Sequence, residues 1–317
     1  MARPGKTPLS SLLKTVLLTS LVFGLPIVAI RISSGFENLE LAAYDAFVRQ
    51  RPPEKLDDRI VIVTISDDDI EQLQQYPIHD GTLAEAIAKL DQAKPRAIGL
   101  DIARDVPQGP PAGRQKLAEV IEQSPVVVAG CLLSTENHPG SPPAPGTPEG
   151  AAAFADFPTD VDKTVRRVKL VSTPGKTQKP LRKQHACNDA RADNEILSMS
   201  FQLATMYLIA EEISPDQTEN NEIRLKKQIL HRLSPNFGGY AQADATDYQM
   251  MLNYRGAQKA FREFSIVDLL KNQVKPEAFR DRVVLIGYTS EVSKDELSTP
   301  YVETQGGSRT ISGVIVH

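Results

Sequence analysis

Two aspartates stand where chemistry could take place. Asp67 and Asp101 lie at the ends of two short apolar runs that are expected to form buried strands. Open α/β sheets bind ligands at the carboxyl ends of their strands. Two carboxylates there could hold a divalent cation or act as a general acid and base. The plainer interpretation is a structural role or a place in a polar pocket, and we favour it. Asp68 and Asp69 fit an ordinary helix N-cap and first-turn acid.

Other polar residues follow two later apolar runs. Asn253 and Arg255 end one predicted strand, and Thr289 follows the next. Arg255 would bring a fixed charge for an anionic ligand, and Asn253 a donor and an acceptor. The alternative is a turn in which Asn253 bonds the backbone and Gly256 has a positive φ angle. An antiparallel strand would also send Arg255 to the opposite edge of the sheet. The predicted ligand-binding residues, if a pocket exists, are Asp67, Asp101, Asn253, Arg255 and Thr289.

The common catalytic motifs are missing from the sequence. It contains no GxGxxG, GxxxxGK[ST] or GxSxG pattern, and its five histidines stand far apart. Cys131 and Cys187 lack metal-ligand spacing and a CxxC partner. They could pair in an oxidising compartment, but a domain of this size does not need a disulfide, so we expect two separate thiols. The sequence therefore predicts no catalytic residue, no metal and no cofactor.

The elements that must position these residues alternate between strand and helix. Strands are expected at 59–65, 96–101 and 125–130, and helices at 68–75, 82–92 and 114–123. Later strands are expected at 165–172, 249–254 and 282–287, and a helix at 196–210. Segments 137–150 and 173–193 are predicted to be exposed, and 222–232 is left unassigned. This order predicts an α/β fold with a mixed, largely parallel sheet flanked by helices.

An apolar segment precedes this body. Residues 9–30 carry one charge, Lys14, and a helix of that length spans about 33 Å, enough for a bilayer core. Arg3, Lys6 and Lys14 ahead of the uncharged stretch predict a cytoplasmic N-terminus at 1–8. A cleaved signal peptide lacks a good cleavage site here, and a buried core helix fits poorly so close to the N-terminus. We therefore expect an uncleaved transmembrane anchor, followed by an amphipathic helix at 36–49.

The charge of the body argues against nucleic-acid binding. The chain has a formal net charge of −4, and without the three basic residues near its start it carries 33 basic and 40 acidic residues. A nucleic-acid-binding protein needs a basic face to meet phosphates. A mildly acidic body predicts no nucleic-acid partner.

The order of segments resembles the CHASE domain of the second type, a sensory extracellular domain associated with cyclases and histidine kinases, especially in its cyanobacterial form. The matching blocks are Leu41–Asp45, Arg49–Pro52, Arg59–Val63, Tyr76–Ile78, Pro95–Ile102, Arg104–Asp105, Val165–Arg167, Phe201–Ala204, Gly238–Tyr240, Leu252–Arg255, Asp281–Gly287, Asp295, Thr299–Tyr301 and Ser312–His317. The sequence departs from the family at Ser312, where a proline is frequent, and in the longer, more basic segment 173–193.

The resemblance implies a sensor domain at 36–317, outside the cytoplasm, ahead of further membrane helices and an output domain such as a kinase or nucleotide cyclase. It implies no enzyme activity for this chain and transfers no ligand or catalytic residue. We therefore expect an inner-membrane signal-transduction protein, for example of a two-component system, with a periplasmic domain that senses an unknown small-molecule or periplasmic signal. A homo-oligomer is expected in the full-length protein. The alternative is a membrane-tethered, metal-dependent hydrolase that uses Asp67 and Asp101.

The membrane orientation can be tested with fusions. Alkaline phosphatase joined after residue 60, or after residue 317 in a second fusion, should be active, because it folds only outside the cytoplasm and the basic flank is expected to stay inside. Inactivity of both fusions would contradict the orientation. A mature N-terminus near Ser33 would contradict the uncleaved anchor.

Overall fold

The computed structural model describes residues 9–52, 54–256, 260–301 and 310–317. Arg3, Lys6 and the predicted cytoplasmic segment 1–8 lie outside the described residues. The chain divides into two compact units: residues 1–50 with 233–246, and residues 51–232 with 247–317. The predicted domain boundaries at 9–30 and 36–317 stay a prediction.

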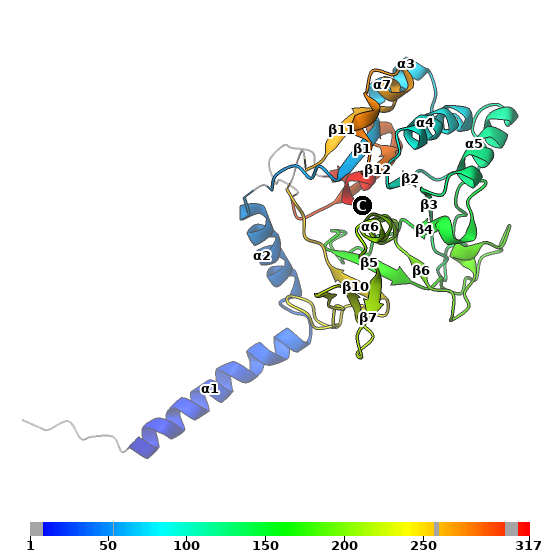
Figure 1. Cartoon of the computed structure of the whole chain (residues 1–317). Helices are drawn as coiled ribbons and strands as arrows, with labels where there is room; N and C mark the ends of the chain where they lie inside the picture. Colours follow the sequence, from blue (N-terminus) through cyan, green and yellow to red (C-terminus); the bar gives the residue numbers. More distant parts are fainter. Residues whose placement is uncertain (1–8, 53, 257–259, 302–309) are drawn as a thin grey trace, which may run out of the picture. The chain divides into compact units, whose positions relative to one another are not determined.

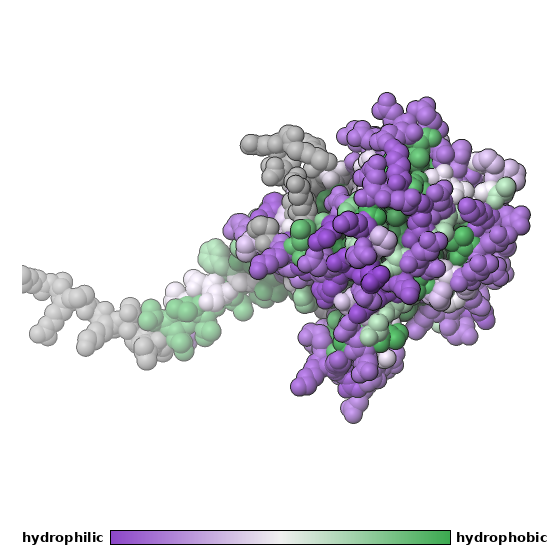
Figure 2. Space-filling model, turned by 45° about the horizontal axis from the view of Figure 1, so that its top comes forward, coloured by the Kyte–Doolittle hydropathy of each residue, from purple (hydrophilic) through white to green (hydrophobic). Residues whose placement is uncertain are grey.

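The first unit contains the apolar helix. Helix α1 spans Leu9–Ile32 and α2 spans Glu37–Gln50, as the sequence predicts (Figure 1). The part from Ser11 to Ile32 is long and apolar enough to cross a membrane and is exposed along its length, which Figure 2 shows as an uncovered apolar helix. Arg31 at its end pairs with Glu40 (2.9 Å) and donates to the carbonyl of Gly238 (2.7 Å). This helix suits a membrane anchor or a signal sequence.

A six-stranded, wholly parallel sheet forms the centre of the second unit, in the order β11-β1-β12-β2-β3-β4. Its strands are β1 (Ile60–Ile65), β2 (Ala97–Asp101), β3 (Val127–Cys131), β4 (Ala152–Phe154), β11 (Arg262–Ser265) and β12 (Val283–Tyr288). This confirms the predicted α/β class and four of the predicted strands. The sequence did not indicate β4 or β11.

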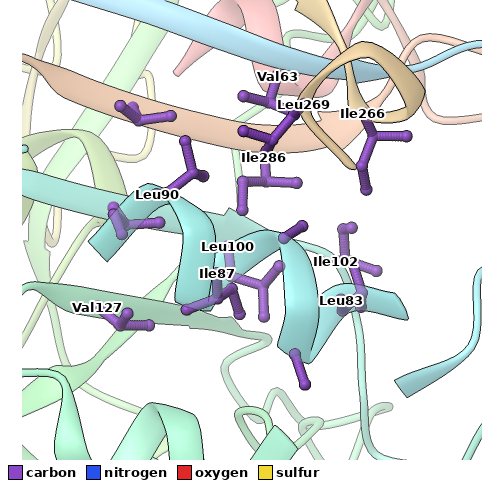
Figure 3. Packing of buried hydrophobic residues seen from close by; sticks show 14 of the residues in the cluster. Val63, Leu83, Ile87, Leu90, Leu100, Ile102, Val127, Ile266, Leu269 and Ile286 are labelled. Atoms are coloured by element: carbon purple, nitrogen blue, oxygen red, sulfur yellow. The ribbon is translucent and has the colours of Figure 1, made fainter. Parts of the chain in front are cut away.

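Helices cover both faces of this sheet. One face packs against α3 (Asp67–Leu73), α4 (Asp80–Gln92), α5 (Pro111–Gln123) and α7 (Ile266–Leu270). Figure 3 shows Leu83, Ile87 and Leu90 of α4 facing the strand residues of that core. The other face packs against α6 (Met199–Ile209) and α8 (Gly313–Val316). The two faces follow the alternation of side chains along a strand: Val284 and Ile286 lie in one core, and Val283 and Leu285 in the other.

The start of α3 corrects one detail. Ser66, not Asp68, is the N-cap, and its side chain accepts a hydrogen bond from the backbone of Asp69. The Asp69 carboxylate accepts in return from the Ser66 backbone (2.8 Å). It also accepts from the hydroxyl of Ser265, so the capping box ties the end of β1 to the end of β11.

Three small antiparallel sheets complete the unit. They are β10-β5-β6, built from Tyr248–Met251, Arg167–Ser172 and Ile196–Leu197; β7-β8-β9, built from Pro215–Gln217, Ile223–Leu225 and Gln228–Leu230; and the hairpin of β13 (Glu296–Ser298) with β14 (Thr310–Ser312). Short 3-10 turns lie at Glu149–Ala151, Ala186–Asn188, Pro276–Ala278 and Glu291–Ser293. The predicted helix at 196–210 begins only at Met199, because its first residues form β6.

The expectation of two separate thiols is wrong. Cys131 at the end of β3 and Cys187 form a disulfide, with Cα atoms 6.4 Å apart. Both are buried, and the backbone of Ser134 also donates to the Cys187 carbonyl (2.8 Å). The segment 173–193 is therefore not wholly exposed, since its middle is stapled to the sheet. The argument from domain size failed because this long segment has few apolar residues of its own to hold it.

The close approach of α8 to the sheet predicts a stability effect. A Cβ atom at Gly287 would lie 2.5 Å from Cβ of Val314, which is attached directly to the helix backbone, so α8 would have to move. Gly287→Ala should lower the free energy of unfolding by about 1–3 kcal/mol, as overpacking does. Gly150→Ala is the matched control, because nothing lies within 4 Å of a Cβ there. Urea unfolding measures both; equal stability of the two variants would contradict the packing described.

Candidate functional site: a cleft at the carboxyl edge of the sheet

A cavity of about 330 Å³ opens where β2, β3 and β12 end. This is the edge at which open α/β sheets bind ligands, and the volume is at the lower end for small-molecule sites. Its wall is part aromatic, part polar. The lining residues on which the argument depends are Tyr76, Asp101, Arg104, Cys131, Tyr288 and Asp295.

Asp101 is the last residue of β2 and is the acid closest to the sheet. Its strand neighbour is Gly287 of β12, which has no side chain to cover it. Burial raises the pKa of Asp101 to about 7, since removing a carboxylate from water disfavours its charged form. Among the residues that the structure describes, His317 places its Nε2 atom 3.7 Å from Oδ1 of Asp101. Asp101 is therefore partly protonated at neutral pH.

Asp295 and His317 surround this acid. Burial raises the pKa of Asp295 to about 6, with a further increase from the charge of Asp101. Burial lowers the pKa of His317 to about 4, against the opposite effects of Asp295 and Asp156. The imidazole also packs on the ring of Phe157, with centroids 4.5 Å apart. His317 is thus uncharged at neutral pH and supplies no cation to the two acids.

Arg104 brings a positive charge to the same cleft. Its side chain is only 1% exposed, yet its Nε and Nη2 atoms have no hydrogen-bond partner in the described structure. The nearest carboxylate is that of Asp80, whose Oδ1 lies 3.6 Å from Nε, beyond hydrogen-bond distance. The other Asp80 oxygen is occupied by Arg114 (3.3 Å) and by the backbone of Gln108 (3.2 Å). Leaving buried donors unpaired costs free energy, more for a charged group, so a ligand acceptor here would be favourable.

The cleft carries charged groups that could bind a ligand. Among the residues that the structure describes, no three His, Cys, Asp or Glu side chains are grouped to hold a metal ion. The hydroxyl of Tyr288 accepts from the backbone of Ile78 (3.0 Å), which fixes one wall of the cleft. What the cleft offers is a donor-rich cation and two acids whose protonation changes near neutral pH.

The structure brings together three of the five predicted site residues. Asp67, Asp101 and Thr289 end or follow β1, β2 and β12 at the same sheet edge. Of these, only Asp101 lines the cleft. Asp67 accepts from the backbone of Glu291 (3.0 Å), and the backbone of Thr289 donates to Ile65 (3.0 Å). Both have structural partners.

Asn253 and Arg255 lie elsewhere. They follow β10, which belongs to an antiparallel sheet. Arg255 pairs with Glu54 (3.2 Å) and Asp57 (3.5 Å), two residues that precede β1 and so belong to the amino side of the main sheet. Asn253 is exposed. The structure does not place either residue in the cleft, and a ligand role for them stays a prediction.

Sequence reasoning missed Arg104 and Asp295 as members of the site. Arg104 follows Asp101 by three residues, so a search of the loop directly after each predicted strand would have found it. Asp295 stands in the polar loop after β12, where the sequence indicated function without indicating a partner. Its proximity to Asp101 arises from the order of the strands, with β12 beside β2.

The fold and cleft define a class: an α/β domain that carries a small-molecule-sized pocket at the carboxyl edge of a parallel sheet. The family comparison is more specific, since the model of the CHASE2 domain matches residues 19–317. The chain therefore belongs to the CHASE2 family, a sensory, non-catalytic family typical of extracellular sensing in signalling proteins. The match does not support a cyanobacterial origin. Comparisons with curated proteins and with solved structures found no match.

The raised pKa of Asp101 predicts a pH-dependent stability difference. The folded chain holds this proton more tightly than the unfolded chain, so the contribution of Asp101 to stability is greatest below about pH 4 and is lost as the pH rises to about 7. Asp101→Asn cannot ionise. It should stabilise the chain above pH 7 by on the order of 4 kcal/mol and have little effect near pH 4.

Urea unfolding of both chains across this range measures the difference. The depressed pKa of His317 acts in the opposite direction between pH 6.5 and about 4, but His317 is present in both chains and cancels to first order. Asp105→Asn makes the same change at an exposed position and should leave the profile unchanged. A constant difference between Asp101→Asn and the parent at every pH would contradict the assignment.

Proposed function

We propose that this chain is the stimulus-sensing part of a membrane-bound signal-transduction protein, and that the cleft receives the signal. The observation that carries the proposal is the buried guanidinium of Arg104, a residue that lines the cleft and has two donors without a hydrogen-bond partner in the described structure. A sensory family needs a site that is incomplete until a ligand arrives, and this cleft meets that need. The proposed setting is an inner membrane, with α1 as the uncleaved anchor and the sheet domain in the periplasm.

Contacts at the cleft suggest how occupancy is passed on. Asp295 precedes β13, which pairs with β14, and β14 leads into α8. The backbone of Gly313 at the start of α8 donates to the carbonyl of Asp295 (3.0 Å). His317 beyond α8 lies against Asp101. A ligand that moves Asp101 or Asp295 would therefore move α8, and we expect further membrane helices and a cytoplasmic output domain to follow it, in a homo-oligomer.

The hydrolase alternative gains no support from the geometry. It requires Asp67 and Asp101 around one metal, but Asp67 accepts a backbone hydrogen bond from Glu291 and does not line the cleft. Asp101 lacks a nucleophile beside it in the described structure, since its nearest polar neighbours are another acid and an uncharged imidazole.

The test uses the full-length protein with its output domain. Arg104→Gln removes the charge of the cleft and should leave output activity at one level, whether cells are in rich medium or in plain buffer. Arg114→Gln is the control: Arg114 also contacts Asp80, but it does not line the cleft. That variant should respond as the parent does. A normal response of Arg104→Gln, in protein with parental stability, would contradict the proposed role of the cleft.

A further inference from the structure

The cleft presents opposite charges that its own residues satisfy only in part. Two guanidinium groups, Arg104 and Arg114, share the single carboxylate of Asp80. Only Arg114 comes within hydrogen-bond distance of it. The Arg104 side of the cleft thus keeps a net positive charge with two free donors, Nε and Nη2. Such a fork matches a carboxylate better than any other small anionic group, apart from phosphate.

The acidic side of the cleft lacks a cation in the described structure. Asp101 and Asp295 both line the cavity. Burial raises the pKa of Asp295 most, and the charge of Asp101 raises it further, so the two carboxylates repel each other. The base beside them, His317, is only 3% exposed and uncharged at neutral pH. A bound ammonium group would satisfy both acids and remove their repulsion.

The size of the cavity restricts what can satisfy both sides at once. About 330 Å³ is at the lower end for ligand pockets, which favours a small molecule over a folded peptide segment. A dicarboxylate would bring a second negative charge against Asp101 and Asp295. A simple amine would leave the donors of Arg104 unpaired.

We propose that the cleft binds a free α-amino acid as its zwitterion, with the carboxylate on Arg104 and the ammonium group between Asp101 and Asp295. This rests on the proposed function of the cleft as the signal site. A further consequence follows from the acids. Because both are partly protonated near pH 6–7 when the cleft is empty, binding of an ammonium group drives them to ionise and releases protons.

The experiment uses the full chain in detergent. Its probes are alanine, serine, leucine and glutamate, each beside its amide and its N-acetyl derivative. At ten times Kd, a bound amino acid should raise Tm by roughly 3 °C. The amide lacks the carboxylate and the N-acetyl derivative lacks the ammonium, so each should bind at least about tenfold more weakly. Calorimetry near pH 6.5 in buffers of different ionisation enthalpy should show proton release.

Matched variants locate the two ends of the ligand. Arg104→Gln and Asp101→Asn should each weaken binding by about tenfold to a hundredfold. Arg262→Gln and Asp105→Asn remove a charge at exposed positions outside the cleft and should bind as the parent does. Asp101→Asn is predicted to be the more stable chain, so its loss of binding would not come from unfolding.

Three results would overturn the inference: no amino acid raises Tm, the amides or N-acetyl derivatives bind as well as the amino acids, or Arg262→Gln loses binding as Arg104→Gln does. The output test with Arg104→Gln distinguishes a failure of the proposed ligand class from a failure of the proposed signal site. If the output of Arg104→Gln does not respond and the parent chain binds no amino acid, the ligand class is wrong and the cleft is still the signal site. A normal output response of Arg104→Gln would overturn both the ligand class and the cleft as the signal site.

Discussion

A parallel sheet has to be covered on both faces, and most of the second unit follows from that constraint. The central strands are apolar on both sides, so α4, α5 and α7 cover one face while α6 and α8 cover the other. Polar side chains of these strands can then be accommodated only at the strand ends. Gly99 illustrates how tight the cover is, because a Cβ atom there would lie 2.6 Å from Leu203 of α6. The carboxyl edge, where the loops diverge, is where a cavity remains.

The cleft differs from the core in how its polar groups are satisfied. Another buried arginine of the described unit is well paired: Arg166, 1% exposed, binds Asp160 (2.8 Å) and Asp162 (2.7 Å). Arg104 is buried to the same extent but has two donors without acceptors. Two arginines in similar burial, one satisfied and one not, separate a structural ion pair from a group that is poised for a ligand. The same contrast distinguishes Asp69 from Asp101, because the Asp69 carboxylate accepts two hydrogen bonds from Ser66 and one from Ser265.

The sequence predicted what depends on local pattern. The β-branched runs of β1, β2, β3 and β12 were found because each is a short apolar segment between turn residues. Strands β4 and β11 were not, since Ala152–Phe154 is only three residues long and three of the four residues of Arg262–Ser265 are polar. Asp101 was recognised because it ends a strand. Arg255 was misplaced because the direction of β10 depends on its partner β5, about 80 residues away along the chain. The insertion of β12 between β1 and β2, which brings Asp295 to Asp101, leaves no local signal.

The disulfide has a consequence for where this protein can mature. Cys131 is both the end of β3 and part of the cleft wall, so the bond that staples Cys187 also completes the ligand site. Thiols stay reduced in the bacterial cytoplasm and oxidise after export. A chain retained in the cytoplasm would form the sheet but not the Cys131–Cys187 disulfide, and the part of the cleft wall at Cys131 would not be fixed by that bond. Under the proposed extracytoplasmic location, the wall of the cleft would therefore be fixed only after the chain has left the reducing cytoplasm.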